Sequence, residues 1–296
     1  MKFPDLNLAL LSALLLIFLG SPAADAADVL YQICGTTGNY TANSTYDLNL
    51  QTLLTNLTTS ATNSSSNFGF AKSTVGSVPN QIFGLVLCRG DVNSSNCSSC
   101  LSQATQDIQN LCPYYKEATI YYDFCLLRFS NQNFLSSTDN TNQVYMWNTQ
   151  NVTGSKTLYS NYVRYLMNTT ADYAAFNRSK KFATGQLNLS QAFPETYGLV
   201  QCTPDMSTSD CASCLNSLID EMLKRFSGRQ GARILGVRCN IRYEIYSFYS
   251  SVSLLSLTPP VENAPAPAPA MTPPVMNPGP QGMERTIYFT CASITS

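Results

Sequence analysis

Cysteine spacing is the feature that most constrains the fold of this chain. Residues 88–100 read CRGDVNSSNCSSC and residues 202–214 read CTPDMSTSDCASC, so both stretches have the pattern C-x8-C-x2-C. The longer segments 82–101 and 196–215 align without a gap at an offset of 114, and in both copies another cysteine follows 25 residues after the third. This self-similarity indicates a tandem duplication of a module of about 105 residues, a normal size for one compact domain.

Hydrophobic spacing predicts the same elements in both copies. Each copy has two stretches with apolar residues at helical spacing, together with runs rich in aromatic and β-branched residues that are typical of strands. We therefore expect an α+β fold in which two helices pack on one face of an antiparallel sheet in each module. The predicted strands include FGLVLC (83–88) and ATIYYDFCLLRF (118–129). The predicted helical faces are Leu50, Leu53, Leu54, Leu57 and Ala61, then Cys97, Cys100, Leu101, Ala104, Ile108 and Leu111, in the first copy, and Leu158, Tyr162, Leu166 and Thr169, then Cys211, Leu215, Leu218, Met222 and Phe226, in the second.

A leader and a tail are predicted to flank the modules. Residues 1–26 have a polar start, an apolar core and small residues before the end, which is typical of a secretory signal peptide. The modules are expected at 27–136 and 141–252, followed by a Pro-rich, disordered tail at 257–296. The apolar runs in the leader and in the tail are both shorter than the roughly 20 residues that cross a bilayer. We expect a secreted chain with no membrane span.

Glycosylation motifs agree with secretion. The sequence contains ten N-x-S/T sequons, and one of them, at Asn96, is set aside because its neighbour Cys97 is expected to form a disulfide. The nine predicted glycosylation sites are Asn39, Asn43, Asn56, Asn63, Asn93, Asn151, Asn168, Asn177 and Asn188.

Composition excludes several classes of function. The net charge is −1 and only 12% of the residues are charged, which argues against the basic surface that nucleic acid requires. The chain contains no histidine, so it lacks the usual general base at neutral pH, any Ser-His or Cys-His nucleophile and the commonest zinc ligand. We expect no catalytic activity, no metal and no cofactor.

The eleven cysteines favour structural disulfides over metal or redox chemistry. Six fall in the first module, four in the second and one, Cys291, in the tail, and even numbers per module in an exported chain are typical of a disulfide framework. A zinc site would need four convergent ligands, and a thioredoxin-like site would need a reactive thiol at the start of a helix. Cys291 leaves open a dimer through the tail, and a dimer through the module faces is a further alternative.

Comparison of the two copies singles out one bridge. Four cysteines are shared, so Cys34 and Cys112 form the pair that only the first module has. The aligned positions of the second module hold Trp147 and Phe226. We hypothesise that Trp147 packs on Phe226 and replaces the covalent link by an aromatic contact. The alternative is that each side chain fills core space independently.

The doubled cysteine pattern, the leader and the segments MWN (146–148) and CNIRYEIYSF (239–248) resemble the plant cysteine-rich repeat proteins. That family comprises ginkbilobin-like antifungal domains, secretory proteins with two such domains, and the ectodomains of cysteine-rich receptor-like kinases. The resemblance covers residues 28–250 and implies a five-stranded antiparallel sheet with two helices in each module. It also implies the disulfides Cys34–Cys112, Cys88–Cys97, Cys100–Cys125, Cys202–Cys211 and Cys214–Cys239.

The resemblance further implies a sugar site, because the single-domain antifungal member of the family is a mannose-binding lectin. Its site resembles an Asn after the first cysteine position, an Arg six residues before the last cysteine and a Glu five residues after it. The second module has this trio as Asn148, Arg233 and Glu244, whose amide, guanidinium and carboxylate groups suit vicinal hydroxyls. The corresponding residues of the first module, which therefore lacks the site, are Gly35, Thr119 and Ser130.

Structural explanations for the same trio remain open. Arg233 and Glu244 on neighbouring strands would also be explained by a cross-strand ion pair that stabilises the sheet. Asn148 would also be explained as the residue that ends a strand.

Two functions fit these observations. The first is a secreted, non-catalytic binding protein of plant defence in the apoplast, which binds a mannose-like glycan through its second module. The second is the ectodomain-only, truncated form of a cysteine-rich receptor-like kinase, which senses or binds an extracellular protein. In that second case the Pro-rich segment corresponds to a juxtamembrane linker and Cys291 has no partner.

Overall fold

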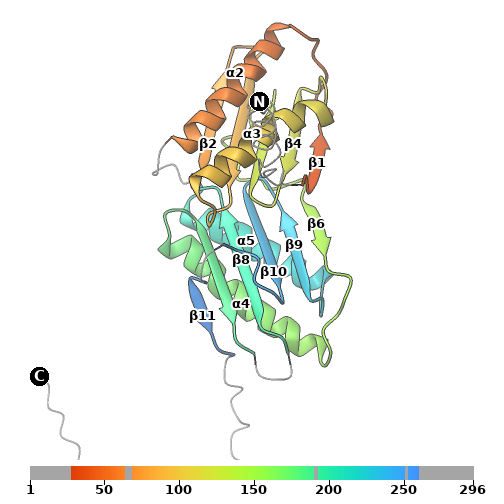
Figure 1. Cartoon of the computed structure of the whole chain (residues 1–296), viewed down its shortest axis with the longest axis vertical. Helices are drawn as coiled ribbons and strands as arrows, with labels where there is room; N and C mark the ends of the chain where they lie inside the picture. Colours follow the sequence, from red (N-terminus) through yellow and green to blue (C-terminus); the bar gives the residue numbers. More distant parts are fainter. Residues whose placement is uncertain (1–27, 64–68, 190–192, 251–252, 260–296) are drawn as a thin grey trace, which may run out of the picture. The chain divides into compact units, whose positions relative to one another are not determined.

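The predicted α+β fold is confirmed in a computed structural model of the chain, with two modules that each contain one sheet and two helices (Figure 1). The structure describes residues 28–63, 69–189, 193–250 and 253–259. The predicted signal peptide, Cys291 and all but the first residues of the Pro-rich tail lie outside the described residues.

The first module is a five-stranded antiparallel sheet with the strand order β1-β4-β5-β3-β2. Helix α2 packs against β2 and β3, and helix α3 packs against β5, both on the same face of the sheet (Figure 1). Ser44 caps α2 and Asn93 caps α3, each through its side-chain oxygen. The elements are β1 (Tyr31–Cys34), α2 (Thr45–Thr62), β2 (Phe70–Val75), β3 (Ile82–Cys88), α3 (Ser94–Leu111), β4 (Glu117–Tyr121) and β5 (Cys125–Ser130).

The second module repeats this arrangement and adds a strand. Its sheet has six strands in the order β11-β7-β8-β10-β9-β6, so the expectation of five strands holds for the first module and is wrong for the second. The added strand β11 pairs in parallel with the edge strand β7 and thereby covers its unpaired backbone groups. The elements are β6 (Val144–Trp147), α4 (Lys156–Asn177), β7 (Phe182–Leu187), β8 (Thr196–Cys202), α5 (Thr208–Arg225), β9 (Gly231–Leu235), β10 (Cys239–Glu244) and β11 (Leu255–Leu257).

Two of the predicted helical faces need correction. Leu111 is 42% exposed, because α3 ends there and the next residue, Cys112, is the one drawn into the core by its disulfide. In α4 the predicted face is displaced by about one residue, and of its four members only Leu166 is fully buried. The helix lies so close to the sheet that a Cβ at Gly185 or Gly198 would overlap its side chains. The buried face of α4 consists of Tyr159, Val163, Leu166, Met167, Thr170, Ala171, Ala174 and Ala175.

The predicted strand run 118–129 is two strands. Strands β4 and β5 belong to this run and pair with each other, and residues 122–124 form the turn that joins them. The turn places Asp123 at the end of the first module's sheet.

The described cysteines form five disulfides, and the pairs are those that the resemblance implies. In each module one bridge joins the end of a central strand, β3 or β8, to the first turn of the second helix. Another bridge joins that helix to the strand beside the central one in the sheet, β5 or β10. The first module has a third bridge, between β1 and the end of α3. The pairs are Cys34–Cys112, Cys88–Cys97, Cys100–Cys125, Cys202–Cys211 and Cys214–Cys239.

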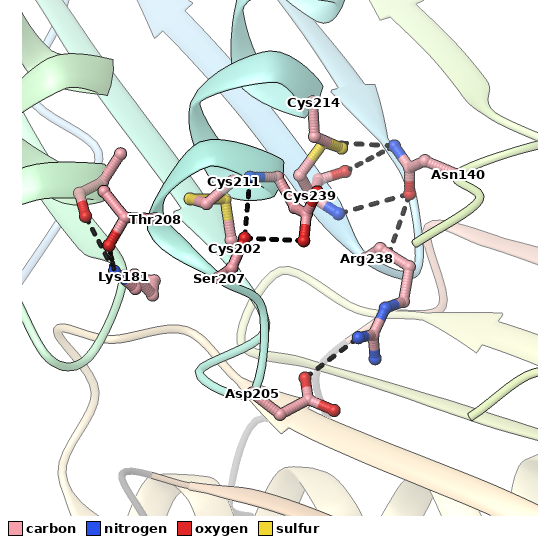
Figure 2. Close-up of a disulfide and its surroundings, with 12 residues drawn as sticks. Asn140, Lys181, Cys202, Asp205, Ser207, Thr208, Cys211, Cys214, Arg238 and Cys239 are labelled. Atoms are coloured by element: carbon pink, nitrogen blue, oxygen red, sulfur yellow. Dashed lines mark hydrogen bonds and ion pairs between the residues drawn. A yellow bond between two sulfur atoms is a disulfide. The ribbon is translucent and has the colours of Figure 1, made fainter. Parts of the chain in front are cut away.

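The two modules contact each other through the β-turn that follows the fourth strand of each module. Val237, in the β9–β10 turn of the second module, lies in an apolar cluster with Leu85, Leu87 and Tyr121 of the first. The segment between the modules is attached to the same turn by Asn140, whose carboxamide bonds the backbone at Arg238 and Cys239 beside the Cys214–Cys239 disulfide (Figure 2). The same carboxamide donates to Sγ of Cys239 at 3.4 Å. Asn140 thus binds the second module at two consecutive residues, which fixes the direction in which that module begins.

Candidate functional site

The second module brings the three predicted sugar-site residues together at one open pocket. Asn148 follows β6, Arg233 lies in β9 and Glu244 ends β10, and these three strands are neighbours in the sheet. The pocket has a volume of about 230 Å³. Its lining consists of Met146, Trp147, Asn148, Ala232, Arg233, Glu244 and Tyr246.

Strand register determines how the charged side chains pair. Arg242 lies opposite Arg233, and Glu244 lies opposite Gly231. Glu244 accepts a hydrogen bond from Nε of Arg242 at 3.0 Å, and Arg233 donates from Nη1 to Asp123 at 2.8 Å. In the part of the chain that the structure describes, the alternative ion pair between Arg233 and Glu244 is therefore not formed, and each of the two residues has a different partner.

Asp123 comes from the first module and contacts three arginines. Its Oδ1 accepts from Arg233 and from Arg242 at 3.1 Å, and its Oδ2 accepts from Arg89 at 3.3 Å. Arg89 also makes a two-point ion pair with Asp91. Three guanidinium groups thus face the carboxylates of Asp91, Asp123 and Glu244, so the cluster as a whole is electrically balanced.

Burial shifts the proton affinity of two pocket residues. It raises the pKa of the Glu244 carboxyl above its ordinary value, and the neighbouring Arg242 offsets only part of that effect. Burial, followed by the like charge of Arg242, lowers the pKa of the Arg233 guanidinium. Both ionised groups lie in a partly desolvated pocket, where hydrogen bonds to a ligand are stronger than in water.

Asn148 ends strand β6, which is the structural role considered above as the alternative to sugar binding. Its Oδ1 accepts from the backbone N–H of Gln150 at 2.9 Å, and its own N–H donates to the carbonyl of Gly231. The side chain therefore stabilises the turn that ends β6. This turn uses only the oxygen of the carboxamide, so a structural and a binding role are compatible.

Sequence reasoning missed several residues of this site. Gly231 is required opposite Glu244, because a Cβ there would overlap the carboxylate. Tyr246 is 51% exposed, and its hydroxyl accepts from Nη2 of Arg242 at 3.3 Å, which places the ring beside the charged groups. Comparison of the two modules could have pointed to Asp123. Asp123 aligns with Val237 and Arg233 aligns with Thr119, so both charged residues have uncharged counterparts in the other module.

The contact between Trp147 and Phe226 is confirmed. The rings stack with centroids 5.2 Å apart and planes 20° apart, at the place where the first module has the Cys34–Cys112 bridge. Phe226 is buried, and Trp147 covers it from the edge of the sheet. An aromatic contact therefore stands where the first copy has a covalent one.

The predicted glycosylation sites are accessible with one exception. Eight of the nine asparagines are exposed, and the exception, Asn168 on α4, is partly buried.

The fold and the disulfides together define a disulfide-rich protein of two tandem α+β modules. A family model described as salt stress response/antifungal matches residues 33–132 and 144–246, and the chain belongs to this family. The two matched segments correspond to the two modules of the structure.

Proteins from several plants are similar in sequence to this chain. The antimicrobial ginkbilobin-2-like protein of Castanea crenata is 41% identical over 234 residues, which are 79% of this chain and 94% of that protein. Cysteine-rich repeat secretory protein 38 of Arabidopsis thaliana is 38% identical over 211 residues, which are 71% of this chain and 81% of that protein. Cysteine-rich receptor-like protein kinase 10 of Oryza sativa is 43% identical over 254 residues, but the match spans only 39% of its length.

A solved structure has the same fold. The tandem DUF26 ectodomain of the Arabidopsis thaliana cysteine-rich receptor-like protein PDLP8 matches 74% of this chain and 98% of its own, with a TM-score of 0.62 and 24% identity. Among the residues that the structure describes, no helix combines the length and the apolar character needed to cross a membrane.

Proposed function

We propose that this chain is a secreted, non-catalytic protein of plant defence that binds a mannose-like glycan in the apoplast through its second module. The observation that carries the proposal is the convergence of Asn148, Arg233 and Glu244 on one open pocket. The antimicrobial relative from Castanea crenata supports the defence role, since the match spans 94% of its length.

The pocket offers the groups that a sugar requires. Glu244 accepts from Arg242 through Oε1, which leaves Oε2 to accept from a sugar hydroxyl. Arg233 uses Nη1 for Asp123, and a guanidinium has further N–H groups to donate. The half-exposed Tyr246 and the side chain of Met146, which lies opposite Arg233, supply apolar surface for the C–H face of a pyranose.

The second candidate function is extracellular sensing through protein contacts, as the ectodomain of a cysteine-rich receptor-like kinase. The match to the rice receptor-like kinase supports it, with 43% identity over 254 residues. Genomic sequence downstream of the last codon decides between the two candidates. An apolar segment of about 20 residues followed by a kinase reading frame would favour the receptor, and a stop codon without either would favour the secreted protein.

A glycan array tests the binding proposal. The intact secreted chain, with its own N-glycans trimmed so that they do not compete, should bind mannose-terminated glycans. Asn148→Ala and Glu244→Gln should lose that binding, whereas Gln150→Ala should keep it, because the exposed Gln150 side chain does not line the pocket. Binding that survives both pocket changes would overturn the proposed site.

A further inference from the structure

The first module contains an acid–guanidinium pair in the place that corresponds to the sugar pocket, but with the acid on the other strand. Nη2 of Arg128 donates to Oε1 of Glu117 at 2.8 Å. Arg128 aligns with Arg242 of the second module, whereas Glu117 aligns with Gly231. Glu117 lies opposite Ser130, just as Gly231 lies opposite Glu244. The aligned arginines therefore each have a carboxylate partner, which comes from β4 in the first module and from β10 in the second.

This pair lies in a pocket that both modules build, which we name the junction pocket. Its volume is about 160 Å³. The first module contributes Glu117, Thr119, Tyr121 and Arg128 from β4 and β5. Beyond the first module, Thr141 and Asn142 precede β6, and Val237 comes from the β9–β10 turn. The pocket therefore exists only in the two-module chain.

Two donors at the junction pocket are buried without a hydrogen-bond partner among the described residues. They are the hydroxyl of Tyr121, a residue that is only 2% exposed, and Nε of Arg128. Leaving a buried donor unpaired is costly, and the great majority of buried polar groups have a partner. Burial also raises the pKa of Tyr121, so its hydroxyl keeps the proton that it can donate. A ligand with hydrogen-bond acceptors would give these donors the partners that they lack among the described residues.

We propose that the junction pocket is a second binding site, for a small neutral polyhydroxylated ligand of monosaccharide or polyol size. The ligand is neutral because Glu117 and Arg128 cancel each other's charge, so a charged ligand would leave an unpaired charge in the pocket. Hydroxyl groups both donate and accept, which matches the carboxylate of Glu117, the hydroxyl of Thr119 and the unpaired donors. The side chains of Ile33 and Val237 give the apolar wall that the carbon face of such a ligand needs.

Calorimetric titration of the intact two-module chain with D-mannose, D-glucose and myo-inositol tests this proposal. The titration is repeated in the Asn148→Ala background, so that heat from the second module's pocket is removed. Trp147 is the only tryptophan of the chain and lines that other pocket, so its fluorescence reports separately on binding there. Failure of the sugar pocket and failure of the junction pocket are therefore distinguishable.

At least one of the three probes should bind the Asn148→Ala chain without a change in tryptophan fluorescence. Glu117→Gln should weaken this binding about tenfold. Tyr121→Phe should weaken it about threefold while leaving the free protein equally or more stable, because the hydroxyl that it removes is unpaired in the free chain. Thr119→Val, a near-isosteric change, should also weaken binding and guards against a folding defect in Glu117→Gln.

Absence of binding by all three probes in the Asn148→Ala background would overturn the proposal. Equal affinity for wild-type, Tyr121→Phe and Thr119→Val chains would overturn it as well. A loss of stability in Tyr121→Phe would mean that the hydroxyl has a structural partner and would contradict the argument on which the site rests.

Discussion

Asp123 and Arg233 form an ion pair between the two modules, with Asp123 Oδ1 2.8 Å from Arg233 Nη1. The residues that align with them are Val237 in the turn of the second module and Thr119 in the sheet of the first. Both line the junction pocket, and both are uncharged. Each module thus presents its β-turn residue to the helix-free face of the other module's sheet, and the chemistry of the turn matches the residue that it meets. The arginine of the proposed sugar site is therefore held by a residue of the other module.

A double-mutant cycle measures this match. Asp123→Val should lower the free energy of unfolding by about 1–3 kcal/mol, because it leaves partly buried guanidinium groups with less counter-charge. The value lies below that of a fully buried pair, since the Asp123 side chain is 39% exposed. Arg233→Thr should relieve part of the loss, with a coupling energy of about 0.5–2 kcal/mol in urea unfolding of the four proteins. Strict additivity of the two changes would contradict the relationship.

The aromatic contact that replaces a disulfide is testable by restoring the disulfide. Trp147→Ala should destabilise the chain by about 1–3 kcal/mol, less than in a fully buried core because the indole is half-exposed. The double change Trp147→Cys and Phe226→Cys should form a bridge like Cys34–Cys112, whose Cα atoms are 5.4 Å apart. Mass spectrometry with thiol alkylation checks this. Alkylation of the new cysteines at both 147 and 226 in the oxidised, folded variant, counted apart from Cys291, would show that the positions are not equivalent.

Asp205 should contribute to stability only above its titration range. Burial acts to raise the pKa of Asp205, but the hydrogen bond from Lys72 and the charge of Arg238 outweigh it, so that the pKa lies below the ordinary 3.8. A depressed folded-state pKa gives stability that is present above 3.8 and is lost as the pH falls through the lower folded value. Asp205→Asn should therefore be about 1–2 kcal/mol less stable than wild type at pH 7, and the difference should shrink below pH 3.8.

Urea unfolding between pH 2 and pH 7 measures this difference. Asp220→Asn is the matched control, because the ion pair of Asp220 with Arg164 is largely exposed and should contribute little at any pH. Asp205 forms ion pairs with Lys72 of the first module and with Arg238 of the second. An equal, pH-independent effect of the two substitutions would argue that these ion pairs do not stabilise the fold.

Glu244 should give the opposite pH dependence. Its pKa is raised by burial, so the folded protein holds the proton to a higher pH than the unfolded chain does. Its contribution to stability therefore falls as the pH rises from the ordinary 4.5 through the folded pKa and is constant above it. Glu244→Gln should remove this slope from the curve of unfolding free energy against pH. A slope that is unchanged in the variant would mean that another group causes it.

The fold was predictable because its signals are local or repeated. The doubled cysteine pattern defined the modules, and helical spacing identified the buried faces of α2 and α5. The face of α4 was displaced because the close approach of the helix at Gly185 and Gly198 selects the buried residues, which spacing alone does not reveal.

The candidate site was predictable only in part. Comparison of the copies gave Trp147 on Phe226. The alternative of an ion pair between Arg233 and Glu244 is wrong, because strand register, which sequence does not fix, places Gly231 and not Arg233 opposite Glu244. Asp123 was missed because it lies 110 residues from Arg233 and in another module, so no local pattern links the two.

Fluorescence of Trp147 tests the central claim most directly, because the only tryptophan of the chain lines the proposed sugar pocket. The chain, with its N-glycans trimmed, is titrated with D-mannose, and emission is recorded for wild type, Gln150→Ala, Asn148→Ala and Glu244→Gln. The account predicts a saturable change in emission for wild type and Gln150→Ala and none for the two pocket variants. No change in wild type, or the same change in all four proteins, would contradict it.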